Sequence, residues 1–213
     1  MTINLTKGQK IDLTKNSPGL TVFRVGLGWE PNIGRSDEIK SKSLLSSLTR
    51  RISEGTEKIR GANFDLDSSI FLVDANEKRV DTVYYGHLDG PNGCIKHQGD
   101  NLTGRGTKGT DKENITVDLT KIPSNVNKLV FVVNIYECKS RNQHFGMVED
   151  AFIHINDANT GNELCRFNLT DDYNNKTALM VGEIYRYSGE WKFYAIGEGT
   201  NDTSLSEMSN KYR

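Results

Sequence analysis

The segment 99–113, GDNLTGRGTKGTDKE, gathers oxygen-bearing side chains between four glycines. Its candidate ligands are Asp100, Asn101, Thr103, Asp111 and Glu113. Calcium is held in proteins by roughly six to eight oxygens from carboxylates, amide and backbone carbonyls, and water. The loop therefore has the composition of a hard-cation site. It is not an EF-hand, because the spacing of acids that such a loop requires does not align on Asp100.

Three further acids could join this loop. Asp65 and Asp67 lie two residues apart in NFDLDSS, so a strand would place them on one face. Adjacent carboxylates repel one another unless a cation or hydrogen-bond donors lie between them. Glu30 ends a predicted strand and could reach the same end of the fold. We therefore predict a Ca²⁺ site formed by Glu30, Asp65, Asp67, Asp100, Asn101, Thr103, Asp111 and Glu113, against the simpler interpretation of solvated turn acids.

Phosphate binding fits the same loop less well. Residues 104–109 satisfy G-x-G-x-x-G, but the fingerprint works only where the glycines lead from a strand into a helix. Here they lead into KENITVDL, which has the pattern of a strand. A Walker loop also fails, since Thr110 follows Gly109 where lysine is required.

Catalytic and zinc patterns are weak, and we predict that the protein is not an enzyme. Cys94 and His97 could bind zinc with Cys138 or His144, but zinc sites usually show two tight ligand pairs and only one exists here. An alternative of the enzyme class uses Cys94 or Cys138 as a reactive thiol, with Lys96 and His97 lowering the pKa of Cys94.

The overall composition limits partners and location. The chain has 213 residues and a net charge of −1, which provides no general basic field for nucleic acid. The first residues lack the apolar core of a signal peptide, and no run is long enough to span a membrane. Three cysteines at unmatched spacing predict free thiols. We expect a cytoplasmic protein with no integral membrane segment.

The elements that must position the loop are short strands. Apolar or alternating runs rich in Val, Ile, Phe and Tyr recur between turn-forming residues, which predicts an all-β fold, an antiparallel two-sheet β-sandwich. Residues 11–29 match 117–136, and 71–85 match 153–167, so we predict two related halves in one domain, 1–199, with a tail at 200–213. The runs are 20–29, 68–74, 79–85, 114–119, 128–136, 151–156, 162–169, 178–187 and 190–197.

An insertion at 35–62 interrupts the first half. Its leucines follow helical spacing and it is rich in lysine and arginine, so it is helical or flexible. A basic amphipathic helix could dock a protein partner or a membrane surface, although a helix packed on the sandwich is the simpler interpretation.

Together these residues resemble the TerD family of bacterial tellurium-resistance and stress proteins. The matching words are GLGWEP (26–31), FDLDSSIFLVD (64–74), GDNLTG (99–104), VDLTKIP (117–123), FGMVEDAFIHI (145–155), TGNELCRFNLTDD (160–172) and GEIYRYSGEWKFYAIGEG (182–199). The resemblance implies a β-sandwich that binds calcium through acidic loops, takes part in tellurite resistance and has no established catalytic reaction. The family's acidic pair matches Asp65 and Asp67, and its loop matches Asp100, Asn101 and Thr103.

The chain departs from the family pattern near the loop. Glu30 stands where the family usually has Asp, and Arg105, Lys108 and Lys112 interrupt a usually acidic run. Cations placed near a divalent ion oppose its binding, so we expect a lower calcium affinity than in an acidic-loop relative. The leading hypothesis is a non-catalytic calcium-binding stress protein, with possible protein partners in a stress-resistance complex. The alternative is a protein–protein scaffold that uses the 35–62 insertion.

Overall fold

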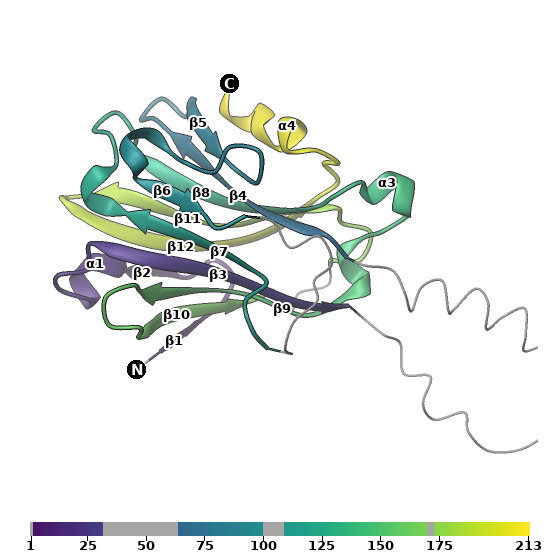
Figure 1. The fold of residues 1–213 in the computed structure, drawn as a ribbon, viewed down its shortest axis with the longest axis horizontal. Helices are drawn as coiled ribbons and strands as arrows, with labels where there is room; N and C mark the ends of the chain where they lie inside the picture. The colour runs from purple at the N-terminus through teal and green to yellow at the C-terminus, as the bar shows by residue number, and fades with distance from the viewer. Residues whose placement is uncertain (1, 32–63, 100–108, 170–172) are drawn as a thin grey trace, which may run out of the picture.

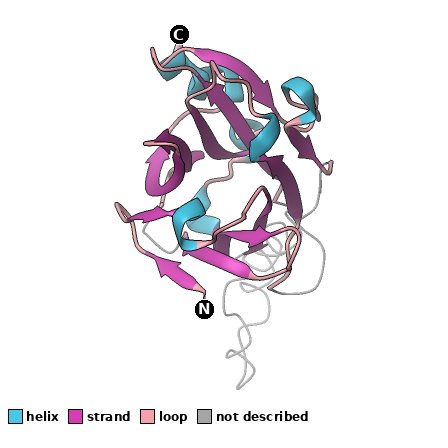
Figure 2. Cartoon of the chain, turned by 90° about the vertical axis from the view of Figure 1, so that its left-hand side faces the viewer, coloured by secondary structure: helices cyan, strands magenta, loops and turns pink. Residues whose placement is uncertain are grey.

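The strands form two six-stranded sheets that pack face to face (Figures 1 and 2). The computed structural model describes residues 2–31, 64–99, 109–169 and 173–213. Sheet I contains, in spatial order, β1 (Ile3–Leu5), β10 (Glu163–Asn168), β9 (Val148–Asp157), β3 (Val22–Pro31), β7 (Glu113–Asp118) and β6 (Ile95–His97). Sheet II contains β2 (Lys10–Asp12), β12 (Glu190–Thr200), β11 (Ala178–Tyr187), β8 (Lys128–Ile135), β4 (Leu66–Val73) and β5 (Arg79–Val83). The predicted all-β sandwich is confirmed.

The main core lies between the sheets. Alternate residues of each strand point inward, as the two-residue period of a strand requires. In β4 the inward side chains include Leu66, Ile70 and Leu72, which are fully buried with Phe23 and Trp29 of the facing sheet. Strands β4 and β8 are buried along nearly their whole length, which explains the consecutive apolar residues at 70–73 and 129–133.

All nine runs that the sequence predicts as strands are strands of the sheets. Sequence patterns missed β1, β2 and β6, which are edge or near-edge strands of three residues and too short for a clear period. The helical pieces within the described ranges have three or four residues each. They are α1 (Leu13–Asn16), η1 (Pro91–Gly93), η2 (Leu119–Lys121), α3 (Cys138–Arg141), η3 (Phe145–Met147), α4 (Leu205–Met208) and η4 (Ser209–Tyr212). The predicted insertion at 35–62 lies outside the described residues.

Each half contributes strands to both sheets, and the corresponding strands of the two halves lie at matching positions in opposite sheets. The neighbouring strands β10, β9 and β3 of sheet I correspond to β5, β4 and β8 of sheet II. The repeated Asp-Ala-Asn motif forms the same turn in the β4–β5 and β9–β10 hairpins. The Asp74 carboxylate accepts a hydrogen bond from Asn76 N at 2.8 Å, and the Asp157 carboxylate accepts one from Asn159 N at 2.9 Å.

The C-terminal residues pack against the outer face of sheet II (Figure 1). Met208 and Tyr212 are 2% and 4% exposed and join a second apolar cluster with Phe71, Val130 and Met180. The rings of Phe71 and Tyr212 lie 5.9 Å apart. Residues 200–213, which the sequence sets apart as a tail, therefore cover the sandwich as far as Tyr212.

Two expectations about chemistry and location can be compared with the fold. Cys94, Cys138 and Cys165 are free and buried, as predicted. Within the described ranges, none of the helices has the length and apolar character needed to cross a membrane.

Substitution of Met208 by alanine should destabilise the domain. The truncation leaves a cavity between α4 and the outer face of sheet II, and burying a methionine of this kind is worth about 2 to 5 kcal/mol. Urea denaturation measures the loss, and Asn210→Ala, at an exposed position two residues away, is the matched control. Equal stability of the two variants would show that the C-terminal segment contributes no packing.

Candidate functional site

The predicted ligands that the structure describes lie toward one end of the sandwich. Figure 1 shows the end of β3, the start of β4 and the start of β7 close to that end. These elements carry Glu30, the Asp65–Asp67 pair and Glu113, with Asp111 just before β7. The predicted ligands Asp100, Asn101 and Thr103 lie outside the described residues.

Asp65 and Asp67 share the outward face of sheet II, as predicted. Phe64, Leu66 and Ile70 belong to the core between the sheets, so Asp65 and Asp67, at the alternate positions, point the other way. Both acids are buried, at 2% and 3% exposure. Asp65 Oδ2 lies 3.8 Å from Arg141 Nη1, and Asn134 Nδ2 donates to Asp67 Oδ2 at 3.4 Å. Two buried carboxylates at one strand end are costly to desolvate, so the site favours positive charge.

Glu113 points the opposite way, into the space between the sheets. Its Oε2 accepts hydrogen bonds from the Ser68 backbone N–H at 2.7 Å and from the Ser68 hydroxyl at 2.5 Å. The His97 and Glu113 side chains have no solvent exposure. Gly99 N donates to His97 Nδ1 at 3.1 Å, so the ring proton lies on Nε2, which donates to Ser68 O at 3.1 Å. This cluster of Ser68, His97 and Glu113 links the two sheets through buried hydrogen bonds.

Hydrogen bonds to His97 and to Glu30 hold the two described ends of the 99–109 loop. The Gly99 N–H binds His97, and the His97 ring lies 3.4 Å from the hydroxyl of Ser68, the residue that follows Asp67 in β4. At the other end, Gly109 N donates to Glu30 Oε1 at 3.3 Å. The Lys112 ammonium is buried and lies 3.6 Å from the same Glu30 oxygen, so a cation already compensates part of that carboxylate's charge. Lys112, one of the cations that interrupt the usually acidic run, thus lies against the predicted ligand Glu30.

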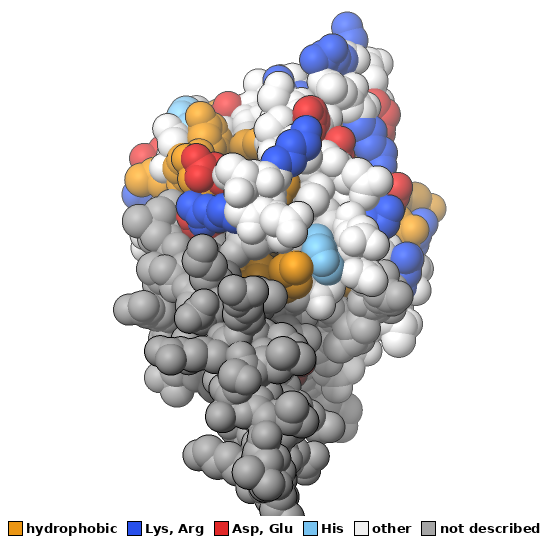
Figure 3. Space-filling model, turned by 90° about the vertical axis from the view of Figure 1, so that its right-hand side faces the viewer, with side chains coloured by type: hydrophobic (Ala, Val, Ile, Leu, Met, Phe, Trp, Pro, Cys, Tyr) orange, Lys and Arg blue, Asp and Glu red, His pale blue; other side chains and the backbone are white. Residues whose placement is uncertain are grey.

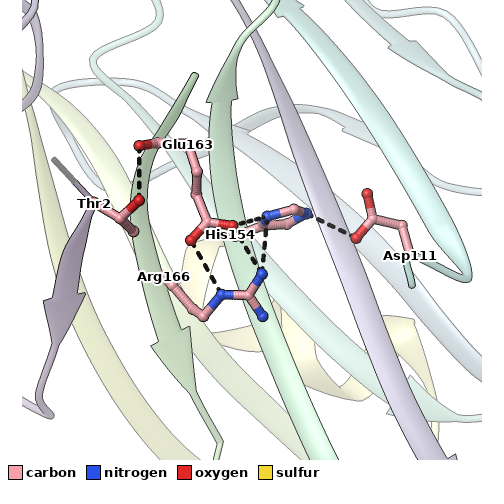
Figure 4. Close-up of polar contacts among 5 residues, drawn as sticks. All are labelled: Thr2, Asp111, His154, Glu163 and Arg166. Atoms are coloured by element: carbon pink, nitrogen blue, oxygen red, sulfur yellow. Dashed lines mark hydrogen bonds and ion pairs between the residues drawn. The ribbon is translucent and has the colours of Figure 1, made fainter. Parts of the chain in front are cut away.

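Asp111 lies on the outer face of sheet I, in a different network (Figure 4). His154 Nε2 lies 2.7 Å from Asp111 Oδ1, and His154 Nδ1 lies 2.7 Å from Glu163 Oε2. Arg166 donates to both Glu163 oxygens, at 3.1 and 2.8 Å. An imidazolium, which donates from both ring nitrogens, matches this arrangement.

The electrostatics of this network agree with its geometry. Burial lowers the pKa of His154, but the hydrogen bonds to Asp111 and Glu163 outweigh burial, so that the pKa lies above the ordinary value of 6.5. The Arg166 guanidinium, with a smaller contribution from His154, lowers the pKa of Glu163. Asp111 is therefore paired with a cationic ring.

The glycines of the GLGW motif, Gly26 and Gly28, leave space for the side chains of Asp111, Phe152 and His154. A Cβ on Gly26 would lie 2.2 Å from His154 Nε2 and 2.4 Å from Asp111 Oδ2. A Cβ on Gly28 would lie 2.3 Å from the Phe152 ring. A Cβ at either position would displace these side chains, so glycine lets them lie directly over β3.

The described acids therefore divide among several surroundings. In the part of the chain that the structure describes, no three His, Cys, Asp or Glu side chains are grouped to hold a metal ion. The described surface at this end carries acidic and basic side chains close together (Figure 3). Sequence reasoning missed the roles of Ser68, His97, His154 and Arg166. For His154 a signal existed, since it alternates with the buried Ile153 and Ile155 and so must face outward.

The cysteine hypotheses find little support in this geometry. Cys94 is fully buried, and burial raises the pKa of its thiol, which disfavours the reactive thiolate. His97, its proposed zinc partner, uses both ring nitrogens in hydrogen bonds within the cluster.

The fold and the acidic end define a β-sandwich with a candidate cation site, and comparisons with known proteins place it in a family. The family profile of the TerD domain matches residues 1–212. The chain is 44% identical over 215 aligned positions to the stress response protein SCP2 of Bacillus subtilis (strain 168), covering 100% of both chains. It is 36% identical over 202 positions to the tellurium resistance protein TerD of Serratia marcescens, covering 93% of this chain and 91% of the other. The chain belongs to the TerD family.

A solved structure agrees with the architecture. A homologue of telluride resistance protein (TerD) from Streptomyces coelicolor A3(2) superposes with a TM-score of 0.64 at 19% identity, covering 90% of this chain and 98% of the other. At this identity the likeness concerns the fold alone. The resemblance to the TerD family, which the sequence motifs indicated, is confirmed by the family match over residues 1–212.

Substitution of Ser68 by alanine should destabilise the protein by about 1 to 3 kcal/mol, because the buried Glu113 carboxylate loses a hydroxyl donor. Urea denaturation measures the change, with Ser206→Ala, at an exposed position, as the control. A Ser68→Ala variant as stable as the wild type would contradict the assigned role of the cluster.

The His154 network should make stability depend on pH. Because the folded pKa of His154 is raised, its stabilising contribution is complete below the unfolded value of 6.5 and is lost as pH rises through the folded value. The free energy of unfolding, measured by urea from about pH 6 to 9, should therefore fall more steeply for the wild type than for His154→Gln. Asn210→Ala, at an exposed position without a titrating side chain, is the control and should keep the wild-type slope. Parallel curves for wild type and His154→Gln would refute the assignment.

Proposed function

We propose that this protein is a non-catalytic, calcium-binding stress protein that contributes to tellurite resistance. The family supports the stress and tellurite roles, since relatives carry those names. The observation that carries the calcium proposal is the pair of buried carboxylates, Asp65 and Asp67, on one face at the start of β4. The loop that follows Gly99 starts against Ser68 of β4, the strand that also carries Asp67.

The donor chemistry fits calcium. Carboxylate, amide and hydroxyl oxygens are the ligands that hard divalent cations prefer, and a cation would relieve the repulsion within the pair. The proposed ligands are Asp65 and Asp67, completed by Asp100, Asn101 and Thr103 from the loop. Glu30, Asp111 and Glu113 are assigned supporting roles, because they are engaged by Lys112, His154 and Ser68 respectively.

This assignment explains how the chain's own residues prepare the site. The cluster of Ser68, His97 and Glu113 holds the first residue of the loop beside β4, and Glu30 holds the last. Bound calcium would supply positive charge that joins loop and strand. An ion that binds only the folded chain stabilises it by about 2.7 kcal/mol at one hundred times its Kd.

A binding role without catalysis agrees with the described side chains. Within the described ranges, the serine–histidine–glutamate cluster has no solvent exposure at His97 and Glu113, and the three thiols are buried. Catalysis requires a group within hydrogen-bond reach of substrate, which these side chains do not offer.

Calorimetric titration of metal-free protein with calcium chloride tests the proposal. We expect saturable binding and a rise in melting temperature, both weakened strongly by Asp65→Asn or Asp67→Asn, since each removes one charged ligand without changing size. Asp12→Asn, on the remote edge strand β2 and paired with Lys192 at 3.0 Å, should bind as the wild type does. A flat titration at millimolar calcium with an unchanged melting temperature would count against calcium binding.

A cellular measurement separates calcium binding from the tellurite role. In a host that lacks its own copy, the wild-type chain should raise survival on tellurite, and Asp65→Asn should raise it less. Full protection by a variant that no longer binds calcium would retain the stress role and remove the ion from it.

A further inference from the structure

A pocket of about 280 Å³ opens on the outer face of sheet II, between the strands and the C-terminal residues 203–205. Its floor is formed by Asp67, Ser69 and Asn134, which point outward from the neighbouring strands β4 and β8. Its walls include Tyr84, Tyr85 and Tyr136. The pocket thus combines a polar floor with aromatic sides.

The floor offers hydrogen-bond acceptors. Ser69 is 2% exposed, and its buried hydroxyl has no hydrogen-bond partner within the described part of the chain. Asp67 adds a buried carboxylate. Asn134 gives an N–H to Asp67, which leaves its carbonyl oxygen as a further acceptor. A buried hydroxyl without a partner is uncommon in proteins and suits a ligand that supplies one.

The walls favour positive charge on an apolar stem. Tyr84 and Tyr85 pack edge to face with centroids 5.3 Å apart, and Tyr85 and Tyr136 do so at 6.3 Å. The Tyr136 ring already carries one cation, the Arg141 guanidinium, 5.3 Å from its centroid. Tyr85 and Tyr136 remain 42% and 38% exposed, so the pocket can be entered from solvent. Aromatic faces attract ammonium groups in the same way.

We propose that this pocket binds a small alkylammonium ion, a primary amine in its protonated form. Three N–H donors of the ammonium match the acceptors of Asp67, Ser69 and Asn134, and the alkyl stem lies along the tyrosine rings. The proposal goes beyond calcium binding and does not need it. Asp67 is common to both sites, so the test is made in the absence of calcium.

The test follows backbone amide resonances of the intact protein by NMR during titration with n-butylammonium chloride. We expect saturable shifts at Ser69 and Asn134. Uncharged n-butanol should give none, and tetramethylammonium, which lacks N–H donors, should bind more weakly. Equal responses to n-butanol and n-butylammonium, or an absence of saturation with the amine, would overturn the proposal.

Variants distinguish the pocket from the calcium site. Ser69→Ala should weaken amine binding about two- to tenfold through loss of one acceptor, and Tyr136→Leu should weaken it at the rim without touching the floor. Asp65→Asn, which is outside the pocket lining, should lose calcium and keep the amine affinity. If both Ser69→Ala and Tyr136→Leu bound the amine as the wild type does, the pocket would not be the site.

Discussion

The buried hydrogen bonds between Ser68 and Glu113 join the two sheets at the end of the sandwich that carries the acidic residues. A carboxylate without solvent exposure is tolerated only where donors surround it, and here both the N–H and the hydroxyl of Ser68 serve it. His97 extends the link from β6 to the Ser68 carbonyl and receives the N–H of Gly99. The start of the acidic loop is thereby attached to the strand that carries Asp67.

Strand geometry then separates the acids by function. Successive side chains of β4 alternate between faces, so Ser68 enters the core while Asp67 and Ser69 face outward. Asp111 lies before β7 begins and is not bound by this alternation: it reaches His154 on the outside of sheet I, whereas Glu113, the first residue of β7, points into the interior. Asp67, Asp111 and Glu113 therefore lie in three chemically different surroundings. Those of Asp111 and Glu113 are structural, and that of Asp67 is suited to a cation.

The same outward face of sheet II supports two of the proposed activities. Its apolar part is covered by Met208 and Tyr212, and its polar part, around Asp67, stays accessible beside the tyrosines. The C-terminal residues therefore complete the core on one side and form a wall of the pocket on the other. The Asp-Ala-Asn turns are alike in the two related halves. The pocket, in which buried Asp67 lies with the partly exposed Tyr85 and Tyr136, is on the outer face of sheet II.

The sequence by itself determined the strands, the sandwich and the family. Long runs such as those of β8 and β11 show their type because burial selects apolar, β-branched residues, and the Asp-Ala-Asn turns are local hydrogen-bonding patterns. It also predicted that Asp65 and Asp67 share a face, since that follows from a period of two. The tertiary structure alone decided which side chain each of these acids meets. Partners such as Ser68 for Glu113, His154 for Asp111 and Lys112 for Glu30 come from strands that meet only when the sheets assemble, and no local spacing encodes that meeting.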